Sequence, residues 1–174
     1  PVAKPRTLKL RLVIDFRGLN LLTIRSSFPI PYIKDLLYKL SKFKVYAKYD
    51  LKSGFWQIPV DLDSIAKLGC ITPEELFVWL VMPFGPRNGP PYFQATVNKA
   101  IAEDELQDEI AAFIDDLATG GDGHEECAAR AGNMLRMLAK RGLKAGADKI
   151  FLGLTEIRFL GFLVEDGTLK PDPE

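Results

Sequence analysis

The stretch AAFIDDLATGG, residues 111–121, joins a short apolar segment to two adjacent aspartates, Asp115 and Asp116. Residues 109–114 have the composition of a buried strand, and Gly120-Gly121 predicts a break in the chain soon after the acids. Neighbouring carboxylates repel each other and lose hydration at a strand end, so a compensating cation is expected. Mg²⁺ prefers hard carboxylate oxygens. A polar turn without a ligand is the alternative that this stretch alone leaves open.

A second apolar strand brings a third acid into consideration. Residues 43–51, FKVYAKYDL, alternate between apolar and polar side chains and reach Asp50 near their end. Adjacent side chains of a strand point to opposite faces, so two neighbouring acids rarely share one ion symmetrically. An acid from a neighbouring strand would complete the site. The pattern therefore predicts that Asp50 joins Asp115 and Asp116 around a divalent cation.

Other metal chemistry has little support in the composition. His124 is the single histidine and lies at an expected helix start, where a surface position is the simpler interpretation. Cys70 and Cys127 are far apart in the sequence and form no CxxC pair, so neither a zinc site nor a disulfide framework is expected. Two reduced cysteines buried as small apolar residues are typical of an intracellular protein.

Length and hydrophobicity are typical of one folded unit. The chain has 174 residues, of which 47% are hydrophobic, which suffices for one core or for two small lobes that share a core. No apolar run approaches the roughly 20 residues of a membrane span. The first ten residues show no secretory signal, because they contain Pro1, Lys4, Pro5, Arg6 and Lys9. No membrane association is expected.

The formal net charge of zero conceals an asymmetry. Residues 1–52 contain twelve Lys and Arg against three Asp and Glu, whereas residues 53–174 contain eleven against twenty. A basic block followed by an acidic one predicts a region that binds a polyanion beside a region that holds cations. Solvated surface charges that cancel in the fold are the alternative.

Hydrophobic periodicity outlines the remaining elements. The pattern predicts a strand over 9–16, a helix opened by Pro29 and Pro31, an apolar strand over 76–82 paired with 67–71, and a helix that begins near Pro90. A further helix is expected after Asp122, ended by Gly142, and the chain closes with a hairpin over 156–170 turned at Asp166-Gly167. Strands and helices in this mixed order predict an α+β fold, an antiparallel sheet with helices packed on one face.

The sequence closely resembles reverse transcriptases, above all those of gypsy-type long-terminal-repeat retrotransposons and retrovirus-like elements. The resemblance covers nearly the whole chain, and the matching blocks lie in the family's order. They are LVIDFRGLN (12–20), TIRSSFPIPYIKDLLYKLSKFKVYAKYDLKSGFWQIPVD (23–61), LVMPFG (80–85), PPYFQATVNKAI (90–101), FIDD (113–116) and FLGFLVEDGTLKPDP (159–173).

The resemblance implies roles for individual residues. Asp50, Asp115 and Asp116 resemble the catalytic carboxylates that hold two Mg²⁺ or Mn²⁺ ions, with Phe113 in place of the tyrosine of the family's YxDD box. Arg11 resembles the residue that contacts the incoming triphosphate, and Phe55 the aromatic ring beneath the deoxyribose. The other implied nucleotide-binding residues are Leu51, Phe84 and Gly85, and the implied primer grip is Phe159, Leu160 and Gly161.

The implied architecture is the right-hand palm with elements of the fingers in a single unit. Residues 1–45 and 62–90 are expected to form fingers, and residues 46–61 and 91–174 to form palm. Thumb, connection and RNase H regions have no counterpart in these residues, so the chain is expected to be part of a polyprotein product or a reduced, domesticated remnant.

The implied function is RNA-directed DNA synthesis from dNTPs on an RNA or DNA template with a primer. The expected setting is intracellular, in a cytoplasmic particle or the nucleus. One alternative is a non-catalytic nucleic-acid-binding or protein-interaction module that kept the fold. Another is an RNA-dependent RNA polymerase palm, against which the aromatic Phe55 and the LVMPFG block argue, because RNA synthesis needs room for a 2′-hydroxyl.

Overall fold

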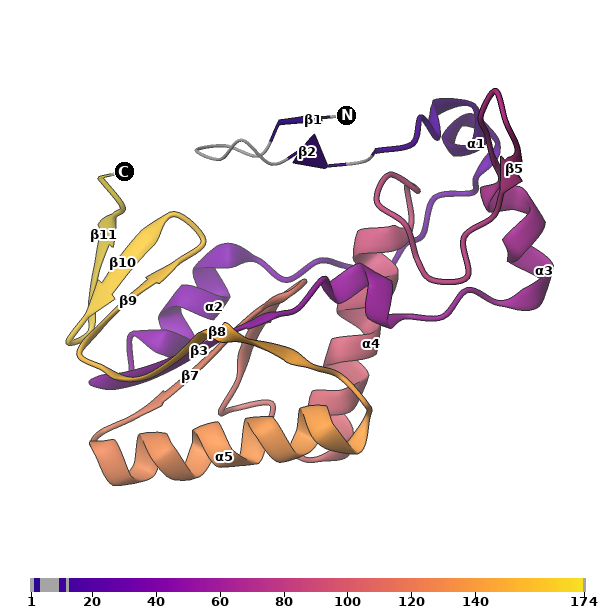
Figure 1. The fold of residues 1–174 in the computed structure, drawn as a ribbon. Helices are drawn as coiled ribbons and strands as arrows, with labels where there is room; N and C mark the ends of the chain where they lie inside the picture. Colours follow the sequence, from indigo (N-terminus) through magenta and orange to yellow (C-terminus); the bar gives the residue numbers. More distant parts are fainter. Residues whose placement is uncertain (1, 4–9, 12, 174) are drawn as a thin grey trace.

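A four-stranded antiparallel sheet forms the centre of the computed structural model, which describes residues 2–3, 10–11 and 13–173 (Figure 1). Its strand order is β6 (Ala111–Phe113), β7 (Asp116–Gly121), β3 (Val45–Leu51) and β8 (Ala145–Leu154). Sequence neighbours β6 and β7 are joined by the tight turn that carries Asp115, and β3 comes from much earlier in the chain. The acidic turn and the C-terminal end of β3 therefore lie next to each other, at one end of the two central strands.

Two long helices cover one face of this sheet. Helix α4 (Gly89–Glu103) buries Phe93 and Val97, and α5 (His124–Lys140) buries Met134 and Leu138, as the apolar spacing predicts. They pack against the odd-numbered side chains of β3, which are buried as Val45, Ala47, Tyr49 and Leu51. Because side chains alternate along a strand, the even-numbered residues of β3 point to the opposite face.

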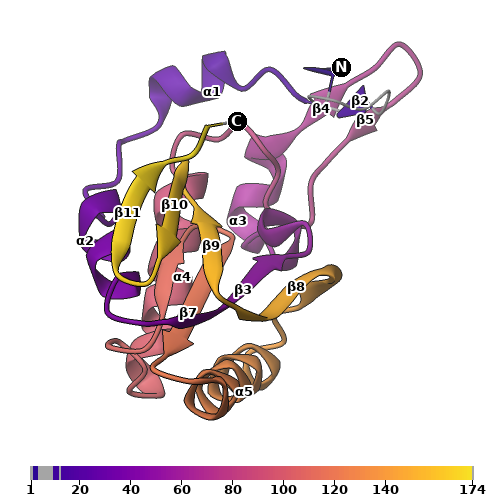
Figure 2. The same ribbon diagram turned by 90° about the vertical axis from the view of Figure 1, so that its left-hand side faces the viewer.

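The opposite face is covered by α2 (Ile33–Leu40) and by a second, three-stranded sheet of β9 (Glu156–Phe159), β10 (Phe162–Glu165) and β11 (Thr168–Pro171) (Figure 2). Tyr46 from β3 and Ala118 from β7 lie in this second core together with Phe159. The turn Asp166-Gly167 joins β10 to β11 with both residues at positive φ, as the dipeptide predicts.

A second group of elements lies beyond the N-terminal end of α4. It contains α1 (Arg17–Leu22), the 3-10 helix η1 (Gly54–Gln57), α3 (Leu62–Ile65), η2 (Ala66–Leu68) and the short antiparallel pairs β1 (Val2–Ala3) with β2 (Leu10–Arg11) and β4 (Cys70–Ile71) with β5 (Leu76–Phe77). The side-chain amide of Asn88 joins the start of α4 to the segment after α1, because it accepts from Ser26 N at 3.0 Å and donates to the Ile24 carbonyl at 2.8 Å.

The predicted α+β class is confirmed, with α4 and α5 on one face of an antiparallel sheet. Several local expectations differ from the structure, including the apolar strand over 76–82, of which only β5 forms. The segment 13–16 forms no strand, because the Asp15 carboxylate binds the Arg17 amide at 3.0 Å and leads into α1. Gly120-Gly121 continues β7 instead of breaking it. A Cβ on Gly120 would lie 2.6 Å from the Val45 carbonyl oxygen, so the two glycines allow close approach within the core. None of the described helices is long and apolar enough to cross a membrane.

Candidate active site

Strand register brings two of the three predicted carboxylates face to face. Asp50 is the direct partner of Asp116 in the antiparallel pair of β3 and β7. Directly opposite residues have Cβ atoms about 4.5–5.5 Å apart. Asp115 precedes Asp116 in the turn between β6 and β7, and its carbonyl oxygen accepts from the Leu51 amide at 2.9 Å. All three acids therefore lie around one end of the β3–β7 pair.

A buried amide fixes the turn that carries these acids. Ile114 has a φ of 55°, a conformation that β-branched residues rarely adopt. The fully buried side chain of Gln94 on α4 accepts from the Ile114 amide at 2.6 Å and donates to the Ala112 carbonyl at 3.1 Å. Gln94 thus provides hydrogen-bond partners for the backbone on both sides of the turn and stabilises its unusual conformation.

The environment of Asp115 disfavours its charge. Burial raises the pKa of the Asp115 carboxyl, and the nearby Asp116 and Asp50 carboxylates raise it further, while Lys149 lowers it. Three acids concentrated in this way create a negative potential that a cation would relieve.

Two lysines of the chain supply positive charge to this end of the sheet. Lys149 on β8 donates to Asp50 Oδ1 at 2.8 Å, and the bond raises the pKa of the Lys149 ammonium. Lys48 on β3 lies 3.2 Å from Asp116 Oδ1. Both carboxylates remain partly exposed, Asp50 at 26% and Asp116 at 30%.

The acids fit a hard divalent cation by their chemistry, although their present arrangement does not enclose one. Within residues 2–3, 10–11 and 13–173, no three His, Cys, Asp or Glu are arranged to hold a metal ion. Asp50 and Asp116 are instead turned towards Lys149 and Lys48. Carboxylate oxygens are the ligands that Mg²⁺ and Mn²⁺ prefer, and each lysine contacts one of the two oxygens of its carboxylate, Oδ1. A cation would therefore bind Asp50 and Asp116 through Oδ2.

An aromatic cluster adjoins the acids. The ring centroid of Phe55 lies 5.1 Å from that of Phe84 and 5.4 Å from that of the buried Phe93. Gly54 lets this cluster meet the acidic turn, because a Cβ at position 54 would lie 3.0 Å from Phe93 Cζ and 3.1 Å from Asp115 Cβ. Phe55 and Phe84, two of the predicted nucleotide-binding residues, are therefore in contact, and Phe55 directly follows the glycine that lies against Asp115.

Two further predicted nucleotide-binding residues, Leu51 and Gly85, are held by backbone hydrogen bonds. Leu51 ends β3 and is buried in the main core, with its amide bound to the Asp115 carbonyl. Gly85 has a φ of 113°, which only glycine adopts easily, and its carbonyl accepts from Asn20 Nδ2 at 3.0 Å. Arg11 belongs to β2, but its side chain lies outside the described part of the structure.

The predicted primer-grip residues form the turn of the β9–β10 hairpin. Leu160 and Gly161 both have positive φ, at 52° and 80°, which is typical of a tight two-residue hairpin turn. The ring of Phe159 is fully buried in the core beneath them, so the turn residues, not the ring, are available to a ligand. The hairpin covers the same face of the sheet as Asp50 and Asp116.

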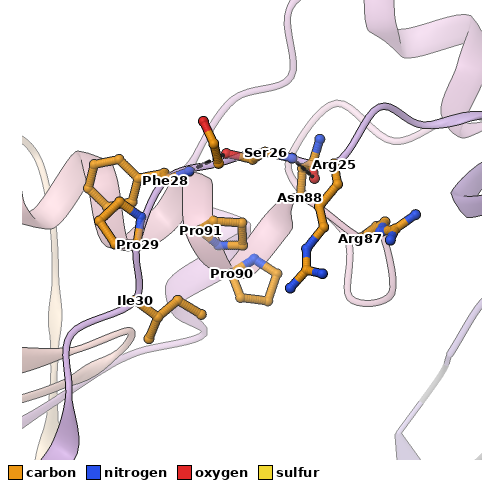
Figure 3. Close-up of a pocket in the computed structure, with 10 residues that line it drawn as sticks. Arg25, Ser26, Phe28, Pro29, Ile30, Arg87, Asn88, Pro90 and Pro91 are labelled. Carbon is orange, nitrogen blue, oxygen red and sulfur yellow. Dashed lines mark hydrogen bonds between the residues drawn. The ribbon is translucent and has the colours of Figure 1, made fainter.

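A pocket of about 730 Å³ lies between the segment 25–30 and the start of α4 (Figure 3). Arg25 and Arg87 line it, together with the rings of Pro29, Pro90 and Pro91. The pocket lies apart from the three acids, and its two guanidinium groups give it a positive charge suited to an anion.

The sequence did not lead us to expect three residues of this site, Lys48, Lys149 and Gln94. Only for Lys48 does the sequence contain a usable signal, its spacing from Asp50. Lys48 is two residues before Asp50, and the strand period of two places both on one face. Lys149 was missed because no strand was predicted over 145–154. Gln94 lies in an otherwise apolar helix stretch, and nothing local indicates that its amide is buried against a turn.

Comparison with known proteins agrees with this geometry. The family model for reverse transcriptase (RNA-dependent DNA polymerase) matches residues 2–164. The chain is 35% identical over 163 residues to the genome polyprotein of Petunia vein clearing virus and 35% identical over 165 residues to a retrovirus-related Pol polyprotein from transposon 297 of Drosophila melanogaster. These alignments cover 94% and 95% of the chain but only 7% and 16% of the relatives.

The fold matches solved structures of foamy viral protease-reverse transcriptase. The complex with double-stranded DNA superposes with a TM-score of 0.89 at 25% identity, over 98% of this chain and 30% of that one. The complex with an RNA/DNA hybrid gives a TM-score of 0.85 at 23% identity, over 95% and 22%. On the match of its family model over most of its length, the chain belongs to the reverse transcriptase (RNA-dependent DNA polymerase) family.

Proposed function

We propose that the chain is the catalytic core of an RNA-directed DNA polymerase in which Asp50, Asp115 and Asp116 are the catalytic carboxylates. The observation that carries this proposal is the β3–β7 register, which pairs Asp50 with Asp116 and sets the half-buried Asp115 beside them. Such a concentration of acids at a strand end has a cost to folding, and a functional site is the simplest reason for it.

The chemistry requires Mg²⁺ or Mn²⁺. Two such ions on the three carboxylates would make a primer 3′-hydroxyl nucleophilic and neutralise the pyrophosphate leaving group. The chain's own residues position the carboxylates: Gln94 holds the acidic turn, and the Leu51 amide holds the Asp115 carbonyl. Lys149 and Lys48 offset the charges of Asp50 and Asp116 through one oxygen of each carboxylate.

The substrates would be dNTPs and a primer on an RNA or DNA template. Phe55, Phe84, Leu51 and Gly85 would form the nucleotide pocket beside Asp115, with Arg11 on the triphosphate. The turn Leu160-Gly161 would hold the primer end, because its hairpin lies on the face that carries Asp50 and Asp116. The foamy viral relatives were solved with double-stranded DNA and with an RNA/DNA hybrid, which supports a duplex partner.

We further infer an origin in a gypsy-type or related retroelement, since a Drosophila transposon polyprotein and plant virus polyproteins match at similar identity. The chain spans a small part of these relatives. Residues 1–45 and 62–90 would serve as fingers, residues 46–61 and 91–174 as palm, and thumb, connection and RNase H would come from a parent polyprotein. Its place of action would be a cytoplasmic particle or the nucleus.

A non-catalytic module with this fold is the second candidate. The lysine contacts at Asp50 and Asp116 favour it, because a structural ion pair needs no metal. This module would bind nucleic acid or protein but would add no nucleotide.

Primer extension on an RNA template with Mg²⁺ and dNTPs separates the two candidates. The wild type should extend the primer, and Asp115→Asn should lose at least about 10²-fold in rate, by analogy with removal of a key transition-state contact. Asp122→Asn, an exposed aspartate just beyond β7, is the matched control and should keep full activity. Extension by Asp115→Asn at the wild-type rate, or none by the wild type, would refute the polymerase.

A further inference from the structure

The Lys48 side chain contacts both the acidic site and the β9–β10 hairpin. It lies two residues before Asp50 on β3, so both side chains point to the face covered by the second sheet. Its ammonium is 3.2 Å from Asp116 Oδ1 and 3.2 Å from the carbonyl oxygen of Arg158 on β9. The same ammonium lies 5.7 Å from the centre of the Phe159 ring.

The hairpin geometry explains why the Arg158 carbonyl points towards Lys48. Phe159 and Phe162 flank the two-residue turn and form its closing pair. Pairs along an antiparallel ladder alternate between hydrogen-bonded and non-hydrogen-bonded, so the next pair, Arg158 with Leu163, directs its backbone groups away from the hairpin. The Arg158 carbonyl therefore faces outward towards β3, which runs alongside β9 (Figure 2).

The contacts of Lys48 differ from those of the other lysine at the site. Lys149 bonds Asp50 and is 52% exposed, so it balances charge at the surface. The Lys48 side chain is only 24% exposed and is held between a carboxylate, a carbonyl and an aromatic face. Charge-assisted bonds of this kind are stronger than neutral ones and fix the distance between the groups that they join.

We propose that Lys48 is a positioning residue that fixes the β9–β10 hairpin relative to Asp116, and thereby aligns the primer end with the catalytic carboxylates. This role rests on the polymerase proposed above. In this role Lys48 contacts a catalytic carboxylate and not the substrate. It acts through the carboxylate of Asp116 on one side and through the backbone of the hairpin on the other, so its loss lets the two parts of the site move independently.

The first test is steady-state kinetics of Lys48→Met and Lys48→Arg on the full chain, with Lys44→Met as the matched control. Lys44 lies just before β3 and is exposed. Loss of a residue that orients a catalytic ligand typically costs about 10–100-fold, so kcat of Lys48→Met should fall by that factor. The dNTP KM should stay within about twofold, because a step-specific loss leaves uniform binding intact. Lys48→Arg keeps a positive charge and several hydrogen-bond donors. Its decrease in log kcat should be at most half of the decrease caused by Lys48→Met.

A second test needs no catalysis. Spin labels on Thr168→Cys in β11 and Ala139→Cys in α5, both exposed, report the distance between the second sheet and the body of the palm in a Cys70→Ser/Cys127→Ala background. Lys48→Met should broaden the distance distribution, whereas Lys48→Arg and Lys44→Met should leave it as in the parent. Lys48→Gln replaces Lys48→Met if the latter loses its cooperative unfolding transition.

Several outcomes would overturn the role of Lys48. These are a kcat for Lys48→Met equal to that of Lys44→Met, a loss expressed only as a higher dNTP KM, a distance distribution unaffected by Lys48→Met, or Lys48→Arg behaving like Lys48→Met in both tests. If the wild type extends no primer, the polymerase proposal fails, and the spin-label comparison still decides whether Lys48 holds the hairpin.

Discussion

Asp50 and Asp116 lie directly opposite each other in the antiparallel pair of β3 and β7, with a lysine bound to each. Like charges directly opposite each other destabilise a sheet, and the half-buried Asp115 adds to the repulsion. Lys149 and Lys48 offset part of this cost. These two ammonium groups offset repulsion between the carboxylates even without a divalent cation.

Cation binding should therefore depend on the three acids together. We expect Mn²⁺ to bind weakly to the wild type, because Mg²⁺-type sites rely on substrate phosphates for further ligands. Isothermal titration of the Asp50→Asn/Asp115→Asn double variant should show no binding heat at this site. Asp63→Asn, an exposed acid in α3, is the control. Equal heats for the wild type and the double variant would refute the assignment.

Asp115 should make the fold less stable as the pH rises. Its pKa is raised in the folded state by burial, so the folded protein holds the proton more tightly than the unfolded chain does. The stability contributed by the protonated form is complete below the ordinary pKa of 3.8 and is lost as the pH rises through the folded value. Asp115→Asn carries no such charge, so it should be more stable than the wild type at pH 7.

Urea unfolding without divalent cations measures this effect. The advantage of Asp115→Asn over the wild type should shrink as the pH falls from 7 towards 3.8, the ordinary value of an aspartate. Asp122→Asn should show no comparable trend. A difference that stays constant over this range, or that favours the wild type at pH 7, would contradict the charge explanation.

Gly54 should be required for the position of Asp115. A Cβ added at Gly54 would lie 3.0 Å from Phe93 Cζ and 3.1 Å from Asp115 Cβ, and the ring of Phe93 is fully buried and cannot move away easily. Gly54→Ala should lower the free energy of unfolding by about 1–3 kcal/mol through overpacking. The displaced carboxylate should also lower the rate of primer extension by at least about tenfold.

Gly18→Ala provides the matched control for Gly54→Ala. Gly18 lies in α1, where an added Cβ would meet nothing within 4 Å. Alanine there should raise the free energy of unfolding by about 0.5–1 kcal/mol, because it favours the helix. If the two variants shift stability alike and both keep full activity, close packing at Gly54 is not what positions Asp115.

The amide of Gln94 should contribute more to stability than a surface hydrogen bond. Gln94→Leu would leave the Ile114 amide and the Ala112 carbonyl without their buried partner. Each unsatisfied buried group costs about 1–3 kcal/mol. Urea unfolding should show a loss of that size, whereas Thr96→Ala, on the same helix, should change stability little. A neutral Gln94→Leu would mean that the acidic turn does not depend on this amide.

Much of the fold was predictable from local patterns, because the deciding signals are local. Alternation over 43–51 and the apolar approach to Asp115-Asp116 predict two strands that end in acids, and the structure forms them as β3 and β6. The strand that pairs with β3 is β7, which follows the acids. The spacing of Leu36, Leu37 and Leu40 predicts α2. Such elements bury one face, so their periodicity survives in the sequence.

Features that depend on distant contacts were not predictable. Gly120-Gly121 is typical of a chain break. In the structure the two glycines are needed for their small size, because Phe43 and Glu126 occupy the space that larger side chains would fill. The apolar segment 76–82 predicts a buried strand, yet Leu76 and Leu80 are 69% and 65% exposed. Only β5 forms there, because this region extends away from both cores. Lys149 reaches Asp50 from a strand whose alternation is too weak to predict.

Phe55 should control which sugar the site accepts. Asp50 lies near the end of β3, and the chain then turns through Ser53, at a φ of 51°, and Gly54 before Phe55. The Phe55 ring leans on Phe84 and on the buried Phe93, so it is held in a fixed position next to the acidic turn. A stiff ring there leaves space for a C2′ hydrogen but not for a 2′-hydroxyl.

Phe55→Val should therefore raise ribonucleotide use relative to deoxyribonucleotide use. The steric clash with a 2′-hydroxyl is worth about 1–3 kcal/mol. Its relief should raise the kcat/KM for rNTP relative to that for dNTP by roughly tenfold for each 1.4 kcal/mol. Phe151→Val, at a half-exposed ring on the edge strand β8, should leave the ratio unchanged. If Phe55→Val still uses dNTPs but its ratio matches the wild type, the ring is a packing residue of the Phe84–Phe93 cluster, and sugar selection must lie elsewhere.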